Sequence, residues 1–141
     1  MVDIAARVER ARQAWNAGDL PGYLSVYDDR IQLHGYSPAP MGKAEATAFY
    51  EMVCGALAAP GLTHPTLEFH EVLVDGDLYC CRFTMSGVQG GEFMGAPASG
   101  RPYSLEGITI MRFDGEQVVE RWSTADFLGM LTQIGAIPAP A

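Results

Sequence analysis

The sequence predicts an α+β fold in which helices come first along the chain and antiparallel strands follow. Two Asp-Gly pairs, Asp75-Gly76 and Asp114-Gly115, each separate two strand-like runs. Such a pair is a strong hairpin signal, because both residue types tolerate positive φ. Helices segregated in front of antiparallel hairpins are typical of α+β proteins. We expect a curved antiparallel sheet that wraps around the N-terminal helices as a cone-shaped roll, whose mouth forms a pocket.

Three helices and one strand are expected before the first hairpin. Residues 2–17 carry apolar side chains at helical spacings near three and four, namely Ile4, Val8, Ala11 and Trp15. Asp19 can cap a second short helix, in which Pro21 comes early enough for its missing N–H to be harmless. An Ala-rich run predicts a third helix at residues 42–57, and a strand at 31–36 precedes it.

The second half of the chain is expected to supply most of the sheet. Strands are predicted at residues 66–74, 78–86, 103–113 and 117–124, and a last helix at 126–134. The long Gly-rich segment 87–102 is expected to be an irregular edge of the pocket. We assign residues 1–135 to one domain, since a chain of 141 residues can bury a single core. Residues 136–141 are expected to form a loose Pro/Ala tail.

Composition excludes several classes of partner. The net charge of −8 argues against nucleic acid and anionic membranes, which both reward clustered Lys and Arg. No apolar run reaches the about 18 residues of a membrane span. The N-terminus lacks a basic-then-apolar signal, so a cytoplasmic protein is expected. The three cysteines suggest no disulfide framework, and without a close Cys/His cluster we expect no metal. No cofactor is expected either.

The strand at residues 31–36 carries the first candidate site residues. Strict alternation places Gln32, His34 and Tyr36 on one face of this strand. A face of this kind is either a solvated surface or one wall of a polar pocket. If it lines a pocket, the imidazole of His34 can act there as general acid, general base or hydrogen-bond donor.

Further candidates lie on the later strands. Arg82 and Thr84 share a strand face, where Arg82 either pairs with a surface carboxylate or anchors an anionic or carbonyl oxygen of a ligand. Trp122 is either a core residue or a stacking platform. Asp126 is either the cap of the last helix or an orienting carboxylate. Arg121 and Ser123 share a strand face that can line the pocket if the strand has no bulge.

The order of motifs in the last third resembles a known family. It reads G-x-P-x-x-G-R, then R-F-D-G, then E-x-W-x-x-x-D-F-x-G-x-L-x-Q-I-G. This pattern resembles the SnoaL-like polyketide cyclases (ester cyclases) of the nuclear-transport-factor-2-like superfamily. The resemblance implies the cone-shaped fold, a homodimer, and cofactor-free acid/base chemistry on a polyketide-like carbonyl or ester, namely cyclisation, isomerisation or elimination. It also implies that the His34-Gly35 strand and the Arg-x-Thr positions face the cavity.

The sequence departs from the family at important positions. The acid/base aspartate of the aldol cyclases falls on Ser123 here, and a histidine of the preceding strand falls on Thr109. In the related limonene epoxide hydrolases an arginine, matched by Arg82, works with two aspartates, whose positions hold Thr84 and Ser123 here. Epoxide hydrolysis by an aspartate pair is therefore disfavoured.

Three hypotheses remain open from the sequence. The first is a small-molecule enzyme with His34 and Asp126 as catalytic residues; its substrate-binding residues would be Gln32, Tyr36, Arg82, Thr84, Thr109, Trp122 and Ser123. The second is a non-catalytic ligand-binding or scaffold protein of the same fold, which the absence of an aspartate at position 123 supports. The third is a hydrolase with a relocated acid. The expected partner is a hydrophobic small-molecule substrate.

Overall fold

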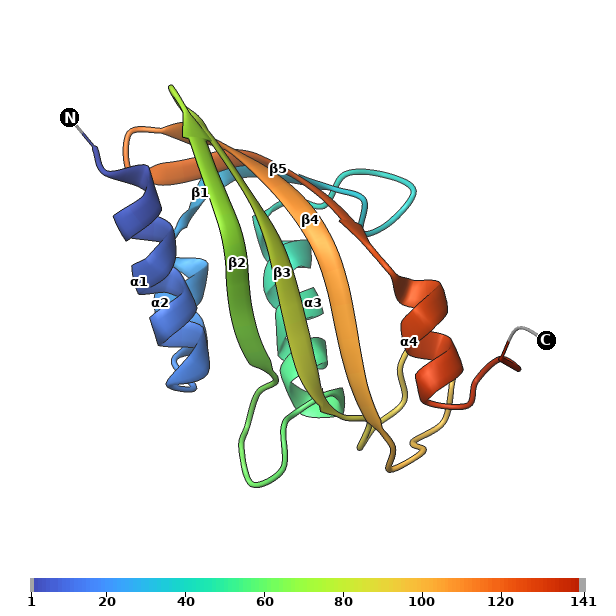
Figure 1. The fold of residues 1–141 in the computed structure, drawn as a ribbon. Helices are drawn as coiled ribbons and strands as arrows, with labels where there is room; N and C mark the ends of the chain where they lie inside the picture. Colours follow the sequence, from blue (N-terminus) through green and yellow to red (C-terminus); the bar gives the residue numbers. More distant parts are fainter. Residues whose placement is uncertain (1, 140–141) are drawn as a thin grey trace.

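The computed structural model describes residues 2–139 (Figure 1). Its elements follow the predicted order: α1 (Ile4–Asn16), α2 (Leu20–Leu24), β1 (Tyr27–His34), α3 (Lys43–Ala56), β2 (Thr66–Asp75), β3 (Leu78–Val88), β4 (Pro102–Asp114), β5 (Gln117–Ala125) and α4 (Phe127–Gln133). The predicted helices and hairpins are confirmed, although β1 starts four residues earlier than expected. Part of the predicted tail, residues 140–141, lies outside the described residues.

The five strands form one sheet in the order β1-β5-β4-β3-β2. Three neighbouring pairs are antiparallel, but β1 runs parallel to β5. The expectation of an entirely antiparallel sheet is therefore wrong at this edge. A parallel pair needs a long connection, and the chain between β1 and β5 supplies it with α3 and three strands. The predicted α+β class and the curved sheet are confirmed.

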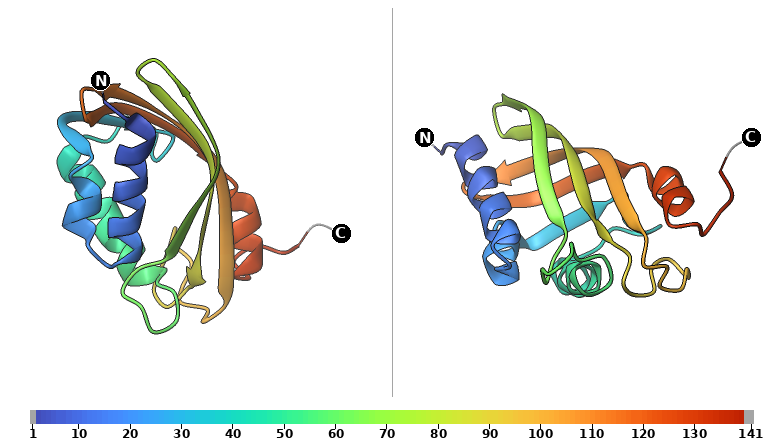
Figure 2. Two further views of the ribbon diagram at one scale, coloured as in Figure 1. Left: turned by 60° about the vertical axis from the view of Figure 1, so that its left-hand side comes forward. Right: turned by 60° about the horizontal axis from the view of Figure 1, so that its bottom comes forward.

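The sheet curves around the first three helices (Figure 2). We call the face toward α1, α2 and α3 the inner face and the opposite one the outer face. Alternation along β4 is regular, with buried side chains such as Leu105 and Met111 on the inner face and exposed ones such as Ile108 and Ile110 on the outer face. The hydrophobic core therefore lies between the inner face and the helices, as the periodicity of α1 predicts.

The last helix covers a free edge of the sheet. Strand β5 pairs with β4 only from Gly107 onward, and α4 lies beside the unpaired start of β4. The Gln133 side chain accepts a hydrogen bond from the backbone N–H of Ser104 at 2.6 Å and donates one to its carbonyl at 3.1 Å. This helix thus satisfies backbone groups that an edge strand would otherwise leave exposed.

The segment between β3 and β4 is held by a buried glutamine. The Gln89 amide is fully buried; it donates to the Ala96 carbonyl at 3.1 Å and accepts from the Ser99 N–H at 3.1 Å. The segment holds Phe93 in a buried position, with its ring stacked on that of Phe127 at 6.3 Å between centroids. Residues 89–101 are therefore an ordered rim of the space under the sheet. Among the described residues, no helix is long and apolar enough to cross a membrane.

Candidate ligand-binding site

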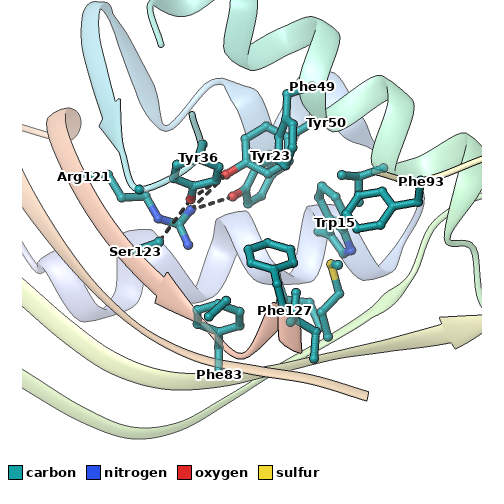
Figure 3. Close-up of a pocket in the computed structure, with 16 residues that line it drawn as sticks. Trp15, Tyr23, Tyr36, Phe49, Tyr50, Phe83, Phe93, Arg121, Ser123 and Phe127 are labelled. Atoms are coloured by element: carbon teal, nitrogen blue, oxygen red, sulfur yellow. Dashed lines mark hydrogen bonds between the residues drawn. The ribbon is translucent and has the colours of Figure 1, made fainter. Parts of the chain in front are cut away.

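A pocket lies between the inner face of the sheet and the helices that it wraps (Figure 3). Its walls are mostly apolar and aromatic, with Trp15, Phe49, Phe83, Phe93, Leu105 and Phe127 among the lining residues. Five polar side chains also line it: Tyr23, Tyr36, Tyr50, Arg121 and Ser123. An apolar cavity with a few convergent polar groups is the usual form of a small-molecule site.

The polar side chains form one hydrogen-bonded cluster around Arg121. Its Nε donates to the Thr109 hydroxyl at 2.8 Å. Its Nη1 donates to three phenol oxygens, those of Tyr23 at 3.0 Å, Tyr50 at 3.3 Å, and Tyr27. The guanidinium is therefore fixed by neutral hydroxyl groups from α2, α3, β1 and β4.

Ser123 and Tyr36 extend this cluster toward the pocket. The Ser123 hydroxyl donates to the Thr109 hydroxyl at 2.9 Å, and Thr109 in turn donates to the Trp122 carbonyl at 2.9 Å. The Tyr36 hydroxyl lies 3.1 Å from that of Ser123 and 3.2 Å from that of Tyr50. Because the single proton of Ser123 is used on Thr109, Tyr36 acts as the donor to Ser123.

Arg121 has no carboxylate partner in the part of the chain that the structure describes. Its hydrogen bonds go only to hydroxyl oxygens, and none of the ion pairs among residues 2–139 includes it. Its Nη2 atom makes no hydrogen bond to these residues, yet it is not sealed from solvent. Two N–H donors of a buried guanidinium are therefore free, in a residue that lines the pocket.

A β-bulge turns Arg121 toward the inside. Strand β5 is in register with β4 at Arg112 opposite Glu120 and at Phe113 opposite Val118, so one extra residue of β5 lies between these pairs. The extra residue reverses the alternation of side chains along the strand. Val118 and Arg121 are consequently both buried although their spacing is odd.

A glycine turns Tyr36 toward the inside at the end of β1. Gly35 has φ of +92°, and a Cβ added to it would lie 2.0 Å from the carbonyl oxygen of Ser123. Only glycine adopts this conformation at no steric cost. The left-handed residue breaks the strand alternation, so that Tyr36 lines the pocket while His34, two residues earlier, does not.

Burial determines the protonation of the cluster. Desolvation raises the pKa of Tyr27 and of Tyr50 well above that of a free phenol, although the positive charge of Arg121 acts in the other direction. For Arg121, desolvation lowers the pKa, but the negative charge that Tyr27, Tyr36 and Tyr50 carry once they ionise raises it, and the pKa lies well above its usual range. At neutral pH the guanidinium cation thus lies against Tyr27 and Tyr50 in their neutral form.

The three predicted site residues Gln32, His34 and Tyr36 do not lie on the same face of the sheet. Gln32 is exposed on the outer face, and His34 is also on that face, where its Nε2 lies 2.8 Å from a carboxylate oxygen of Glu120. The His34 ring stacks on that of Trp122 at 5.4 Å between centroids. The expectation that Gln32, His34 and Tyr36 share one wall of the cavity is wrong, because Gly35 reverses the alternation between them.

Arg82, Thr84 and Trp122 are also on the outer face and do not line the pocket. Arg82 donates to Glu71 at 2.8 Å, which is the surface pairing considered from the sequence. The Thr84 hydroxyl lies 2.8 Å from Nε2 of His70. The expectation that these three residues line the cavity is therefore wrong. On β3, the strand of Arg82 and Thr84, the inner face is occupied by Cys81, Phe83 and Met85.

The remaining predicted residues are near or in the pocket. Ser123 and Tyr36 line it, and Thr109 is fully buried behind them. Asp126 does not line it; this residue is exposed and caps α4, accepting a hydrogen bond from the Gly129 N–H at 2.8 Å. The predicted capping role of Asp126 is confirmed.

Sequence reasoning missed the tyrosine cluster. Tyr23, Tyr27 and Tyr50 belong to three different elements, and no local sequence pattern connects them. Their shared partner, Arg121, was the available signal, because an arginine on an inward strand face needs several hydrogen-bond acceptors nearby. No group of three or more His, Cys, Asp or Glu side chains suited to a metal ion occurs in residues 2–139.

The pocket is narrow in this conformation. Its cavity volume is about 70 Å³, below the ~300 Å³ at which sites for drug-sized ligands begin. Phe93 comes from the segment between β3 and β4, and Phe127 from the start of α4. A ligand with several rings therefore requires side chains such as these two to move.

The fold and pocket define a class of small-molecule-binding α+β proteins, and comparison with known proteins identifies the family. A family model described as SnoaL-like polyketide cyclase matches residues 5–134. The chain belongs to this SnoaL-like polyketide cyclase family. A comparison with curated proteins found no match.

Solved structures agree with this assignment. AclR from Streptomyces galilaeus, for which a hydroxylase function has been suggested, is 25% identical, with a TM-score of 0.83 over 96% of this chain and 98% of that chain. TsrD from Streptomyces laurentii is 26% identical, with a TM-score of 0.82 over 97% of this chain and 100% of that chain. IdmH from Streptomyces antibioticus, a suggested polyketide cyclase, is 22% identical, with a TM-score of 0.78 over 95% and 99%. At that identity IdmH supports the fold alone.

Proposed function

We propose that this protein binds a hydrophobic, polyketide-like ketone or ester and promotes its cyclisation, isomerisation or elimination without a cofactor. The substrate's carbonyl oxygen would bind to the free N–H groups of Arg121, and the Tyr36 hydroxyl would turn its proton from Ser123 to the same oxygen as a second donor. The observation that carries this proposal is the free Nη2 of Arg121, a buried residue of an otherwise mostly aromatic pocket. Family membership supports the same general type of reaction.

The proposed chemistry is electrostatic stabilisation of an enolate. Removal of a proton next to a carbonyl places negative charge on the oxygen, and preorganised donors lower the barrier because they need not reorient. Arg121 is preorganised by Thr109 and the tyrosines. We propose that His34 and Asp126, which do not line the pocket, have structural roles instead.

Deuterium exchange tests this proposal without knowledge of the natural substrate. An aryl ketone such as butyrophenone is incubated in D₂O with the protein, and deuterium at the carbon next to the carbonyl is followed by NMR. We expect the wild-type protein to accelerate exchange above the buffer background, and Arg121→Gln to lose most of that acceleration. Exchange equal to background, for a ketone that demonstrably binds, would refute catalysis.

The second candidate function is ligand binding without turnover. Among the described residues, those lining the pocket include no Asp, Glu or His, so no strong general base is available there. This observation favours a binding protein, and it argues against a hydrolase with a relocated acid. Saturable binding of aryl ketones with no acceleration of exchange is the expected result for this candidate.

We further propose that two copies pair through the outer face, as expected from the resemblance, and that the protein is cytoplasmic. Ile108 and Ile110 are 55% and 40% exposed on that face, which supports pairing. Light scattering after size exclusion tests the first proposal: Ile108→Glu should convert a dimer to a monomer. A wild-type monomer would contradict it.

A further inference from the structure

The buried positive charge of Arg121 has no negative partner among the described residues. Arg121 is only 5% exposed. Several other elements direct ionisable groups toward its guanidinium. These groups are Tyr23 of α2, Tyr27 of β1, Tyr36, Tyr50 of α3, and Tyr79 and Cys81 of β3. None of them is a carboxylate, and burial raises the pKa of Tyr27, Tyr50 and Cys81, which keeps these three uncharged at neutral pH.

An uncompensated buried charge is costly unless an opposite charge approaches it. Neutral hydroxyls satisfy the Nε and Nη1 hydrogen bonds of Arg121, but they do not neutralise its charge. The remaining donors, on Nη2, are not fully buried and make no hydrogen bond to the described residues. An anionic oxygen bound there would make a charge-assisted hydrogen bond in a site of low polarity, where such bonds are strongest.

We propose that the pocket selects its ligand as an anion, namely the enolate of a β-dicarbonyl compound such as a β-diketone or β-keto ester. The inference rests on the proposed function, because it assigns the substrate class of the same site. A β-dicarbonyl has a carbon between two carbonyl groups whose proton is unusually acidic. Its enolate spreads one negative charge over two oxygens, which matches a guanidinium nitrogen and a neighbouring phenol donor.

The proton balance requires no base in the pocket. The bond that breaks is the C–H bond between the two carbonyls; its electron pair passes to the two oxygens, and the proton goes to water or hydroxide. Arg121 and Tyr36 keep their protons and act as donors throughout. The absence of Asp, Glu and His from the lining residues that the structure describes is then consistent with this substrate class.

A matched pair of single-ring probes tests the inference. Benzoylacetone ionises at mildly alkaline pH, whereas butyrophenone has the same carbon skeleton and stays neutral. Binding of both is measured by calorimetry from neutral to mildly alkaline pH, and the ultraviolet spectrum of bound benzoylacetone reports its ionisation. We expect the protein to bind the anion about tenfold to a hundredfold more tightly than the neutral form, as a hydrogen bond to a charged group provides. The ionisation of bound benzoylacetone should shift to lower pH by the same factor.

The variants separate a charge effect from a structural one. Arg121→Gln should abolish the shift, Arg121→Lys should retain part of it, and Arg82→Gln should leave it unchanged. If Arg121→Gln does not fold, the spectrum of benzoylacetone on the wild-type protein still decides the question. Binding of both probes without a shift in ionisation would overturn the anion inference and leave the proposed carbonyl site intact. No saturable binding of either probe would overturn both.

Discussion

Arg121 and Arg82 show opposite ways of placing an arginine on the same sheet. Arg82 is on the outer face, where it donates to Glu71 and comes within 4.0 Å of Glu106. Arg121 is buried on the inner face and has only hydroxyl partners among the described residues. Water already solvates the charge of the exposed Arg82, so its carboxylate partners add little stabilisation. The charge of the buried Arg121 is shielded from water and has no carboxylate among the described residues to stabilise it.

This difference teaches that a functional arginine is recognised by its surroundings rather than by its motif. The Arg-x-Thr pattern pointed to Arg82, yet a surface ion pair of this kind contributes little to stability or recognition. Arg121 combines burial, a rigid set of neutral partners and free donors at a pocket. Donors arranged in this way are preorganised to bind a negatively charged group of a ligand.

The sharpest test of the contrast is to neutralise each arginine in turn. We predict that Arg121→Gln lowers the rate of ketone deuterium exchange about a hundredfold or more, as loss of one oxyanion donor does. The same change at Arg82 should alter the rate less than about twofold, because a surface pair contributes at most ~1 kcal/mol. Equal losses in both variants would show that the two faces do not differ in function.

A second test breaks the turn that separates the two faces. Gly35→Ala should lower the free energy of unfolding by roughly 3 kcal/mol, since it adds left-handed strain and a clash with the Ser123 carbonyl. Gly61→Ala is the control, because Gly61 has φ of +75° but open space around it. That variant should cost only about 1 kcal/mol. Urea denaturation measures both, and similar costs would refute the clash.

Alkaline pH tests the buried phenols of the inner face. Burial raises the pKa of Tyr27 and Tyr50, so above pH 10 the unfolded chain releases these protons before the folded one does. Their stabilisation is complete below the unfolded pKa and is lost as pH rises toward the folded one. Each phenol should contribute a slope of about 1.4 kcal/mol per pH unit above pH 10.

Urea denaturation between pH 9 and 11 measures this slope, and phenolate absorbance follows the ionisation itself. Tyr27→Phe should make the slope smaller by about one phenol's share. A free energy of unfolding that does not fall above pH 10 would contradict the burial of these hydroxyls.

A smaller effect, on ligand affinity, is expected from removing the Tyr36 hydroxyl, which joins the Arg121 cluster to the pocket. Tyr36→Phe removes the hydroxyl that lies 3.1 Å from Ser123 and 3.2 Å from Tyr50. Loss of one neutral hydrogen bond of about 1 kcal/mol should weaken aryl ketone binding roughly fivefold. Calorimetric titration measures the change. Unaltered affinity would remove Tyr36 from the proposed oxygen site.

The smallest effect is predicted on the outer face. His34→Ala should leave ketone exchange and binding unchanged within about twofold, and should lower stability by less than ~1 kcal/mol through loss of its Glu120 contact. Exchange kinetics and urea denaturation measure the two quantities. A large loss of exchange in this stable variant would restore the imidazole as the catalyst.

The fold was predictable because its signals are local. The spacing of apolar residues in α1 and the Asp-Gly pairs between strands need only neighbouring residues to be interpreted, and the structure agrees with both. Ser123 and Thr109 were likewise named from the sequence, and both belong to the inner polar cluster.

The faces of the other candidates were not predictable, because single residues reverse the alternation. In β5, the extra residue between Val118 and Glu120 reverses which side chains face the pocket. The left-handed Gly35 does the same after β1. Neither feature has a sequence signal strong enough to place it. The cluster around Arg121 joins residues as far apart as positions 23 and 121, so it follows only from the tertiary fold.

A crystal structure of the protein with benzoylacetone tests the central claim most directly. We predict that the ligand lies between the inner face and the helices, with one oxygen within hydrogen-bond distance of Nη2 of Arg121 and its ring among the aromatic side chains. A ligand bound instead on the outer face, against Trp122 and His34, would contradict the assignment of the site.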